Sequence, residues 1–394
     1  MDLFAKCRKF NAQVKVVKSL NQFFYLREID PPATPTVTMG GKKMIMLGSN
    51  NYLGLANHPK VIEAAIKAVK KFGTGACSSR ILTGTTSLHN KLERELARFK
   101  GTEDAVVFST GFMTMMGTIT ALTEEGDVIL SDEFNHASIV EGCRLSRAQV
   151  KVYKHNDMKS LEEMLSECKR SANKLIVTDG VFSMKGSVAN LPEIKSLADK
   201  YKAKIMVDDA HGTGALGATG RGILEHFDME GAIDLVCGTF SKTLSSAGGF
   251  TGASSEVVSF LRLQSRPFIF SASSPPSVAA TVMACLEVIE EEPELLERLH
   301  KNTEFMKQGL KDLGFEVEET ITPIIPVLIG NDRKAFKLTG GLEKEGVFIN
   351  PVVYPAVPKG SALIRVSIMA SLSTDELQTA LDKFKLVGKK LRII

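Results

Sequence analysis

The chain has 394 residues, with 49 Lys and Arg against 45 Asp and Glu, and a formal net charge of +4. Its 44% hydrophobic and 24% charged residues are typical of a globular protein and exclude disordered, collagenous and fibrous chains. The small positive excess does not indicate nucleic-acid binding. The length predicts two packed domains, or one large α/β domain with an appendage.

The sequence contains few signals for targeting, membrane insertion or disulfide formation. No stretch approaches the roughly 20 apolar residues that cross a bilayer, and the first 20 residues lack the apolar segment of a secretory signal. The six cysteines contain no CxxC pair and do not cluster with histidine, so neither a metal site nor a disulfide framework is expected. These features predict a cytoplasmic protein without a metal.

The composition of the first 45 residues predicts that they form an N-terminal arm. Basic residues are scattered among apolar positions in its first 20 residues, and prolines follow near residue 31. The basic residues fit either peripheral contact with acidic lipid head groups or a solvated face. Both interpretations remain open at this point.

Helical and strand periodicities alternate between residues 60 and 240. Apolar residues recur at i, i+3, i+4 and i+7 over 62–69, 161–168 and 194–201, and a further helix is predicted over 88–99. Short β-branched runs predict strands at 105–108, 128–130, 175–177, 205–207 and 233–236. This alternation predicts an α/β fold with right-handed crossovers and a mostly parallel sheet, in a large domain over 46–285.

The pattern changes after about residue 285. A long charged helix is predicted over 285–313, followed by strands around Val327, Phe348 and Ile364. We interpret residues 286–394 as a smaller α+β domain.

Polar residues follow two of the predicted parallel strands, where ligands of such sheets bind. Asp208 and His211 come after one strand, and Lys242 comes after another. Each alone has an ordinary explanation, such as a turn cap or a solvated lysine. Together, an amine, a carboxylate, an imidazole and neighbouring hydroxyls are what pyridoxal 5′-phosphate (PLP) requires, because the lysine forms a Schiff base and the acid keeps the ring nitrogen protonated.

Seven ordered stretches at compatible spacing resemble the α-oxoamine synthase family of fold-type I PLP enzymes. They are SNNYLGL at 49–55, GTG at 73–75, STGF at 109–112, NHAS at 135–138, DGVFSM at 179–184, DDAH at 208–211 and GTFSK at 238–242. The resemblance runs from about Phe24 to the C-terminus. It implies a PLP-binding large domain and a smaller C-terminal domain.

The resemblance also implies roles for individual residues. Lys242 would form the Schiff base, Asp208 would face the pyridinium nitrogen, His136 would stack on the ring, and His211 and Ser183 would lie near the phenolic oxygen. The remaining cofactor contacts would hold the phosphate: the amides of Gly111 and Phe112, the hydroxyls of Thr239 and Ser241, and the stretch Ser271, Ala272 and Ser273 reaching in from a neighbouring subunit. A homodimer with shared active sites follows from that last contact.

Two residues are candidates for substrate binding. Arg365 lies inside an apolar strand and therefore needs an anionic partner. The resemblance implies that this partner is the carboxylate of the substrate amino acid, and a structural ion pair is the alternative. Asn50 resembles a substrate-pocket residue, while Leu372 stands where relatives often carry histidine.

The family joins an amino acid to an acyl-CoA thioester with loss of carbon dioxide. In the resemblance, Lys242 released from the cofactor removes the Cα proton, and His136 either holds the amino-acid carboxylate or polarises the thioester carbonyl. Ser241 before the lysine and the stretches at 266–273 and 346–353 most resemble bacterial serine palmitoyltransferases. L-Serine and palmitoyl-CoA, giving 3-ketodihydrosphingosine, are therefore favoured over the substrates of 8-amino-7-oxononanoate synthase or 2-amino-3-ketobutyrate CoA ligase.

Two rival functions come from outside this class. Residues 212–217 contain G-x-G-x-x-G after a strand, which is the dinucleotide fingerprint of a nicotinamide-dependent oxidoreductase. However, Gly220 and Gly222 would interrupt the helix that must follow, and two acids at the strand end would repel a pyrophosphate. A non-catalytic scaffold subunit is the other rival, and Lys242 argues against it.

Overall fold

The computed structural model describes residues 2–20, 22–31 and 33–394. The chain divides into two compact units: a large unit, Asn50–Leu299, and a small unit that combines Met1–Ser49 with His300–Ile394. These boundaries differ from the predicted domains 1–45, 46–285 and 286–394, since the N-terminal segment and the C-terminal segment share one unit. Residues 1, 21 and 32 of the predicted arm lie outside the described residues.

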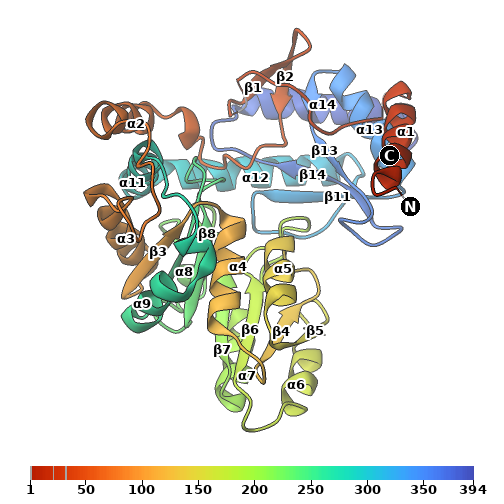
Figure 1. Ribbon diagram of the computed structural model, residues 1–394. Coiled ribbons are helices and arrows are strands. Elements are labelled where there is room, and N and C mark those ends of the chain that lie inside the picture. Colours follow the sequence, from red (N-terminus) through yellow and green to blue (C-terminus); the bar gives the residue numbers. More distant parts are fainter. Residues whose placement is uncertain (1, 21, 32) are drawn as a thin grey trace. The chain divides into compact units, whose positions relative to one another are not determined.

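A seven-stranded sheet forms the centre of the large unit, in the order β3-β9-β8-β7-β6-β4-β5 (Figure 1). Its strands are β3 (Asp104–Phe108), β4 (Val128–Asp132), β5 (Gln149–Tyr153), β6 (Lys174–Asp179), β7 (Lys204–Asp208), β8 (Leu235–Thr239) and β9 (Gly249–Ala253). All neighbours from β8 to β5 are parallel, and β9 is antiparallel to both β3 and β8. The predicted α/β class and mostly parallel sheet are confirmed.

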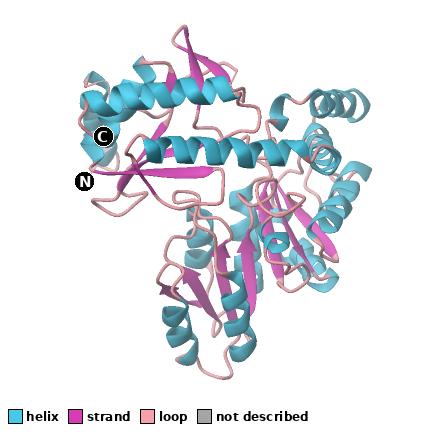
Figure 2. Cartoon of the chain, turned by 180° about the vertical axis from the view of Figure 1, so that it is seen from behind, coloured by secondary structure: helices cyan, strands magenta, loops and turns pink. Residues whose placement is uncertain are grey.

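Helices cover both faces of this sheet, as Figure 2 shows from behind. One core contains residues of α6 (Met158–Ser166), α7 (Leu191–Tyr201) and α8 (Ile223–His226). The opposite core contains residues of α4 (Gly111–Leu122), α5 (Ala137–Leu145), α9 (Ser255–Gln264) and α10 (Arg266–Ile269). Because both faces are covered, all six residues of β6 are buried, and residues 175–177 at its centre are all apolar.

Two strands of the sheet were not predicted. In β5 apolar and polar residues alternate at the sheet edge, and Val150 and Val152 stay exposed. In β9 the glycines hide the strand signal, because glycine is unfavourable in strands unless a close approach requires it. A Cβ on Gly249 would lie 2.6 Å from the carbonyl oxygen of Gly238.

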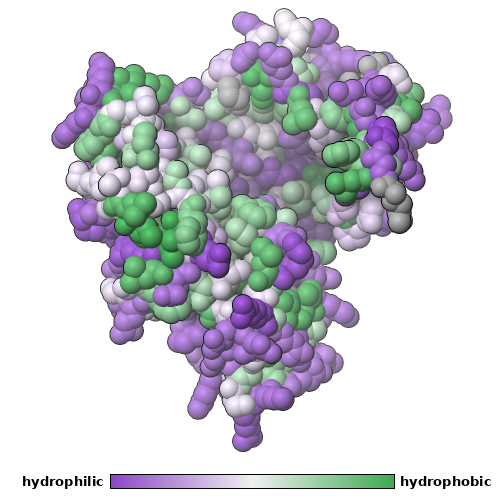
Figure 3. All heavy atoms as spheres, viewed as in Figure 1, coloured by the Kyte–Doolittle hydropathy of each residue, from purple (hydrophilic) through white to green (hydrophobic). Residues whose placement is uncertain are grey.

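The other helices of the large unit are α2 (Pro59–Phe72), α3 (Ser87–Lys100) and α11 (Pro276–Glu291), preceded by the short helix η1 (Leu55–Asn57). Helix α11 packs against α2 and α3. Part of the apolar stripe predicted on α2 remains exposed, including Ile62 at 44% and Ile66 at 49% (Figure 3). The predicted single helix over 285–313 is wrong: α11 ends before Pro293, which has no N–H to donate, and α12 (Glu294–Asp312) begins after it.

The small unit contains a four-stranded antiparallel sheet, in the order β10-β11-β14-β13, and a three-stranded sheet, β1-β2-β12. Its strands are β1 (Thr36–Met39), β2 (Lys42–Met46), β10 (Glu316–Val317), β11 (Ile324–Gly330), β12 (Val347–Phe348), β13 (Asn350–Val352) and β14 (Ala362–Ser367). Its helices are α1 (Ala5–Ser19), α13 (Asp332–Lys344) and α14 (Thr374–Lys390), together with most of α12. The three strands predicted in this region are confirmed.

The N-terminal segment is more than an arm. Strand β2 pairs in parallel with β12, and Met44 and Met46 are buried, so this part of the N-terminal segment contributes to the core of the small unit. Helix α1 contributes no buried residue. Among the helices described for this chain, none offers a run long and apolar enough to span a membrane.

Candidate active site

A cavity of about 280 Å³ opens at the carboxyl ends of the parallel strands. Its lining includes nine residues singled out from the sequence: Gly111, Phe112, His136, Ser183, Asp208, His211, Thr239, Ser241 and Lys242. Their positions follow from the fold, because Asp208 ends β7, Thr239 ends β8 and Gly111 begins α4. The rule that ligands bind beyond the ends of parallel strands therefore located the cavity.

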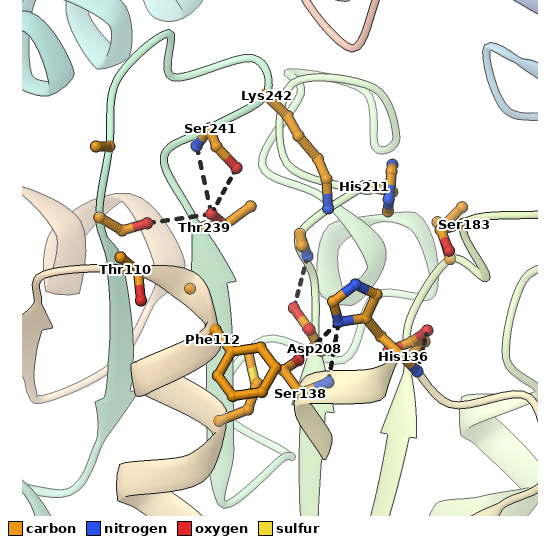
Figure 4. Close-up of a pocket in the computed structure, with 17 residues that line it drawn as sticks. Thr110, Phe112, His136, Ser138, Ser183, Asp208, His211, Thr239, Ser241 and Lys242 are labelled. Carbon is orange, nitrogen blue, oxygen red and sulfur yellow. Dashed lines mark hydrogen bonds between the residues drawn. The ribbon is translucent and has the colours of Figure 1, made fainter. Parts of the chain in front are cut away.

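Lys242 and Asp208 approach the cavity from successive strand ends. The Lys242 side chain extends toward the space surrounded by Asp208, His136 and His211 (Figure 4). Asp208 accepts a hydrogen bond from the amide of Ala210 at 3.1 Å. Burial raises the pKa of Asp208 to about 6, while the charge of Lys242 acts in the opposite direction. The site thus places an amine near a buried carboxyl group.

Asp179 is a second buried carboxyl group, and sequence reasoning assigned it no role. It ends β6 and lies beside Asp208 in the register of the sheet. It lines the cavity, and its carboxylate accepts the backbone N–H of His136 at 3.1 Å. Burial and the charge of Asp208 raise its pKa well above the ordinary value. Asp179 could have been identified from the sequence by its position at the end of an apolar run, which it shares with Asp208.

His136 stands at the N-cap of α5. Its Nδ1 lies 2.7 Å from the Ser138 hydroxyl, which fixes the orientation of the ring (Figure 4). Although the residue is partly exposed, the surrounding protein and the charge of Lys242 lower the pKa of the imidazole. A neutral ring at neutral pH is suited to lie against a flat cofactor face.

His211 belongs to a hydrogen-bonded chain that includes a tyrosine missed from the sequence. The hydroxyl of the fully buried Tyr52 lies 2.7 Å from His211 Nδ1. It also lies 3.4 Å from Oδ1 of Asn50, the predicted substrate-pocket residue. Tyr52 occurs in the SNNYLGL stretch, so the motif itself pointed to it. Asn50 does not line the cavity, but Tyr52 connects it to His211.

The other end of the cavity can bind an anion. The first amides of α4 have no partner within the helix, and a helix N-terminus favours negative charge. The Thr239 hydroxyl lies 2.9 Å from that of Ser241. A Cβ on Gly111 would lie 2.7 Å from the Thr239 hydroxyl oxygen, so only glycine brings the α4 backbone this close to it. These groups could hold a phosphate.

Five predicted site residues, Asn50 and four others, are not among the residues that line the cavity. Ser273 donates through its amide and its hydroxyl to the carbonyl oxygen of Ser78, and Ala272 forms a bridge with Ser79. Ser271 lies 3.7 Å from the sulfur of Met113. Arg365 belongs to the small unit, where it is buried in β14 and donates to the Ser367 hydroxyl at 2.5 Å. Leu372 follows β14 in the same unit and is also buried.

The glycine-rich stretch at 212–217 is not a dinucleotide fingerprint. Residues 209–222 form turns and bends, whereas a fingerprint requires a helix to begin among its glycines. A Cβ on Gly212 would lie 2.0 Å from Asp209 Oδ1, and one on Gly214 would lie 2.2 Å from the Thr243 methyl group. The glycines therefore make room for side chains of the same unit, which removes the sequence basis for an oxidoreductase.

Comparisons with known proteins agree with this geometry. The family model for aminotransferase class I and II matches residues 42–384. A serine palmitoyltransferase of Bacteriovorax stolpii is 48% identical over 377 residues, which cover 95% of this chain and 90% of that protein. An 8-amino-7-oxononanoate synthase of Thermoanaerobacter pseudethanolicus is 44% identical over 383 residues, 97% of each chain.

A solved structure has the same fold as this chain. It is a serine palmitoyltransferase from S. paucimobilis with a bound PLP–myriocin aldimine, and it matches with a TM-score of 0.96 and 35% identity over 100% of both chains. The predicted fold-type I architecture is confirmed. The chain belongs to the class I and II aminotransferase family and, within it, to the α-oxoamine synthases.

Proposed function

We propose that this chain is a PLP-dependent acyltransferase of sphingolipid biosynthesis that condenses L-serine with palmitoyl-CoA. The products are 3-ketodihydrosphingosine, CoA and carbon dioxide. The observation that carries the proposal is the meeting of Lys242, Asp208 and His136 in one cavity, in a chain 48% identical to a serine palmitoyltransferase.

The residues of the cavity fit PLP. The cofactor needs an amine for its aldehyde, an acid for its ring nitrogen and donors for its phosphate. Lys242 and Asp208 supply the first two, and the start of α4 with Thr239 and Ser241 supplies the third. His136 would cover one face of the ring, and His211 and Ser183 would lie near its phenolic oxygen. When bound, PLP supplies an electron sink for negative charge that develops at the Cα of an amino acid.

Each residue then has a defined task in the reaction. Lys242 Nζ would hold the aldehyde of PLP, and as a free amine it would take the Cα proton and could later return it. Asp208 would supply a negative charge for the ring nitrogen of PLP, which would favour the protonated ring. Tyr52 holds His211 in one orientation through their 2.7 Å hydrogen bond. His136 would contact the substrate carboxylate or the thioester carbonyl.

Arg365 is proposed to bind the carboxylate of the amino acid. Its side chain is buried in β14, where Ser367 accepts one of its N–H groups. The planar fork of a guanidinium matches the geometry of a carboxylate, which lysine could not bind in the same two-pronged way. Asn50 is proposed as a second substrate contact through its link to Tyr52.

8-Amino-7-oxononanoate synthase activity is the second candidate. It is favoured by the 44% identity to such an enzyme over 97% of the chain. That reaction uses alanine and a pimeloyl thioester in place of serine and palmitoyl-CoA. Ser241 before the lysine is the sequence feature that favours the serine enzymes.

A product assay separates these candidates. Purified protein loaded with PLP should be yellow, and its visible band should shift when serine is added. We expect the highest kcat/KM with serine and C16 acyl-CoA among serine, alanine and glycine combined with acyl chains of increasing length. A preference for alanine with pimeloyl-CoA would refute the first candidate and support the second. Borohydride reduction followed by mass spectrometry should place the cofactor on Lys242, and an adduct on another lysine would contradict the site.

The proposal includes a homodimer with shared active sites and a cytoplasmic location. Exposed apolar residues on α2 and α9, such as Ile62 and Phe260, support burial against a second copy of the chain. The cysteines are all free, as a reducing compartment requires. Light scattering of the purified protein should give twice the 42.8 kDa chain mass; a monomer that remains fully active would contradict the shared sites.

A peripheral contact with lipid is also proposed, through α1. This helix contains five Lys and Arg residues and no acidic residue, and Phe10 on it is 67% exposed. Such a helix suits an anionic membrane surface, where a long acyl-CoA also partitions. Sedimentation with anionic vesicles should recover more protein than sedimentation with neutral vesicles, and Lys9→Gln with Lys15→Gln should reduce the difference. Equal recovery with both vesicles would refute the contact.

A further inference from the structure

A buried ion pair lies directly behind the strand end that carries Asp208. Lys100, the last residue of α3, places Nζ 2.7 Å from Oδ2 of Asp209. The same ammonium donates to the Thr213 hydroxyl at 2.7 Å and to the carbonyl oxygen of Arg221 at 2.5 Å. The side chains of Lys100 and Asp209 are 3% and 1% exposed. All three donors of the ammonium are therefore satisfied inside the protein.

The loop after β7 is built around the Asp209 carboxylate. Its Oδ1 accepts the amide of Ile223 at 3.2 Å, at the far end of the loop. A Cβ on Gly222 would lie 1.9 Å from Oδ2, and one on Gly212 would lie 2.0 Å from Oδ1. The loop contains His211, so the position of this histidine depends on how Asp209 is held.

The second effect of the ion pair is electrostatic. Asp208 and Asp209 are adjacent in the chain, and both are buried. Burial raises the pKa of Asp208 to about 6, and the negative charge of Asp209 adds to the rise. Lys100 compensates that charge. Without it, Asp209 would be a buried carboxylate without a counter-ion, and Asp208 would be pushed toward its neutral form.

We propose that Lys100 is a positioning residue for the cofactor: by holding and neutralising Asp209, it keeps Asp208 available as an anion for the ring nitrogen and fixes the loop that carries His211. The inference rests on the proposed function, because it concerns PLP. Lys100 does not line the cavity and acts through Asp209. The two carboxylates of the DDAH stretch thus have different tasks.

Lys100→Met in the full-length chain tests the proposal. Circular dichroism establishes that the variant is folded, and titration gives its affinity for PLP. We expect a loss of about tenfold or more, the size expected when a hydrogen bond between charged groups is weakened. The carbocyclic analogue in which C–H replaces the ring nitrogen should show little change, because it makes no use of the Asp208 charge. Equal losses for PLP and the analogue would mean that Lys100 has only a structural role.

The double variant Lys100→Met with Asp209→Asn provides a rescue. It removes the ammonium and the carboxylate together, so no unpaired charge remains to act on Asp208 or to prevent folding. We expect PLP affinity within about threefold of the unaltered chain, since the charge penalty is gone. Affinity as poor as that of Lys100→Met, in a folded double variant, would overturn the proposal, and so would normal PLP affinity in Lys100→Met itself. If the unaltered chain failed to bind PLP, the proposed function would fail instead.

Discussion

The two edges of the large sheet differ in the side chains that line their cavities. The cavity at the amino ends of the strands has a volume of about 580 Å³, and the one at the carboxyl ends has about 280 Å³. At the amino edge, Asp234 pairs with Lys204 at 2.7 Å and accepts the amide of Ile205, so its carboxylate serves to hold strand ends. Asp127 likewise accepts from Asn173 at 2.8 Å.

At the carboxyl edge, two carboxyl groups, two imidazoles and an amine line one cavity. Asp179, Asp208, His136, His211 and Lys242 reach it from different strands and loops. The arrangement follows from the parallel sheet, in which the loops after the strands lie together at one edge. The comparison teaches that the convergence of carboxyl, imidazole and amine groups distinguishes the candidate active site, and that cavity volume does not.

Replacing one lysine at each edge should give the largest difference in turnover between the two edges. Lys242→Ala should reduce turnover by about a thousandfold or more, because the covalent attachment and the proton acceptor are both lost. Lys204→Ala should change kcat/KM by no more than about twofold, since Lys204 is 74% exposed at the amino edge. Steady-state product assays with serine and palmitoyl-CoA provide the measurement. Comparable losses in both variants would break the comparison.

Arg365→Ala extends the comparison to the small unit. We expect the KM for serine to rise by about tenfold or more, because a charge-assisted hydrogen bond to the carboxylate is lost. PLP content, measured by absorbance, should stay unchanged. Arg333→Ala, at an exposed position of α13, serves as the control and should behave like the unaltered chain. Normal serine binding in Arg365→Ala would assign the arginine to a structural ion pair.

Asp208→Asn should change how stability depends on pH. The folded pKa of Asp208 is about 6, against an ordinary value of 3.8, so between these pH values the native state retains a proton that the unfolded state has lost. The cofactor-free protein should therefore lose stability as pH rises from about 4 to about 6, by about 1–3 kcal/mol from this group.

Thermal unfolding of cofactor-free protein at several pH values measures this effect. Asp208→Asn should flatten the decline in Tm, whereas Asp234→Asn at the amino edge should retain it. An unchanged pH profile in Asp208→Asn would show that the buried carboxyl group is already ionised at low pH.

Tyr52→Phe should have the smallest effect of the set. The change removes the 2.7 Å hydrogen bond to His211 and leaves the packing of the ring intact. A neutral hydrogen bond contributes about 0.5–1.5 kcal/mol, so kcat should fall by about two- to tenfold with little change in stability. Tyr25→Phe, at a position that is 53% exposed, is the control. Identical kcat values for Tyr52→Phe and the control would show that the function of His211 does not depend on the Tyr52 hydroxyl.

Much of the fold could be predicted from local patterns. Buried parallel strands are continuous apolar runs, so β4, β6 and β7 were found close to their observed bounds. Helices with one apolar face were found in the same way, and the helix predicted over 88–99 is α3, Ser87–Lys100. Strands β5 and β9 escaped because an edge strand and a glycine-rich strand do not carry that signal.

The candidate site divides along similar lines. Residues whose chemical type is unusual at a strand end, such as Asp208 and Lys242, could be identified from sequence. Asp179, Tyr52 and Lys100 could not be assigned a task, because each acts through a partner that is distant in the chain. Tyr52 and His211 are 159 residues apart, and Lys100 and Asp209 are 109 apart.

The sequence by itself therefore determined the class of fold, the edge of the sheet at which the candidate site lies and most of the side chains that meet there. These depend on periodicity and on residue type, which are local properties. Only the tertiary structure decided which carboxyl group faces the cavity and which is neutralised behind it, and that β2 joins the small unit rather than an arm. Such choices depend on burial and on pairing between distant segments, which no local pattern records.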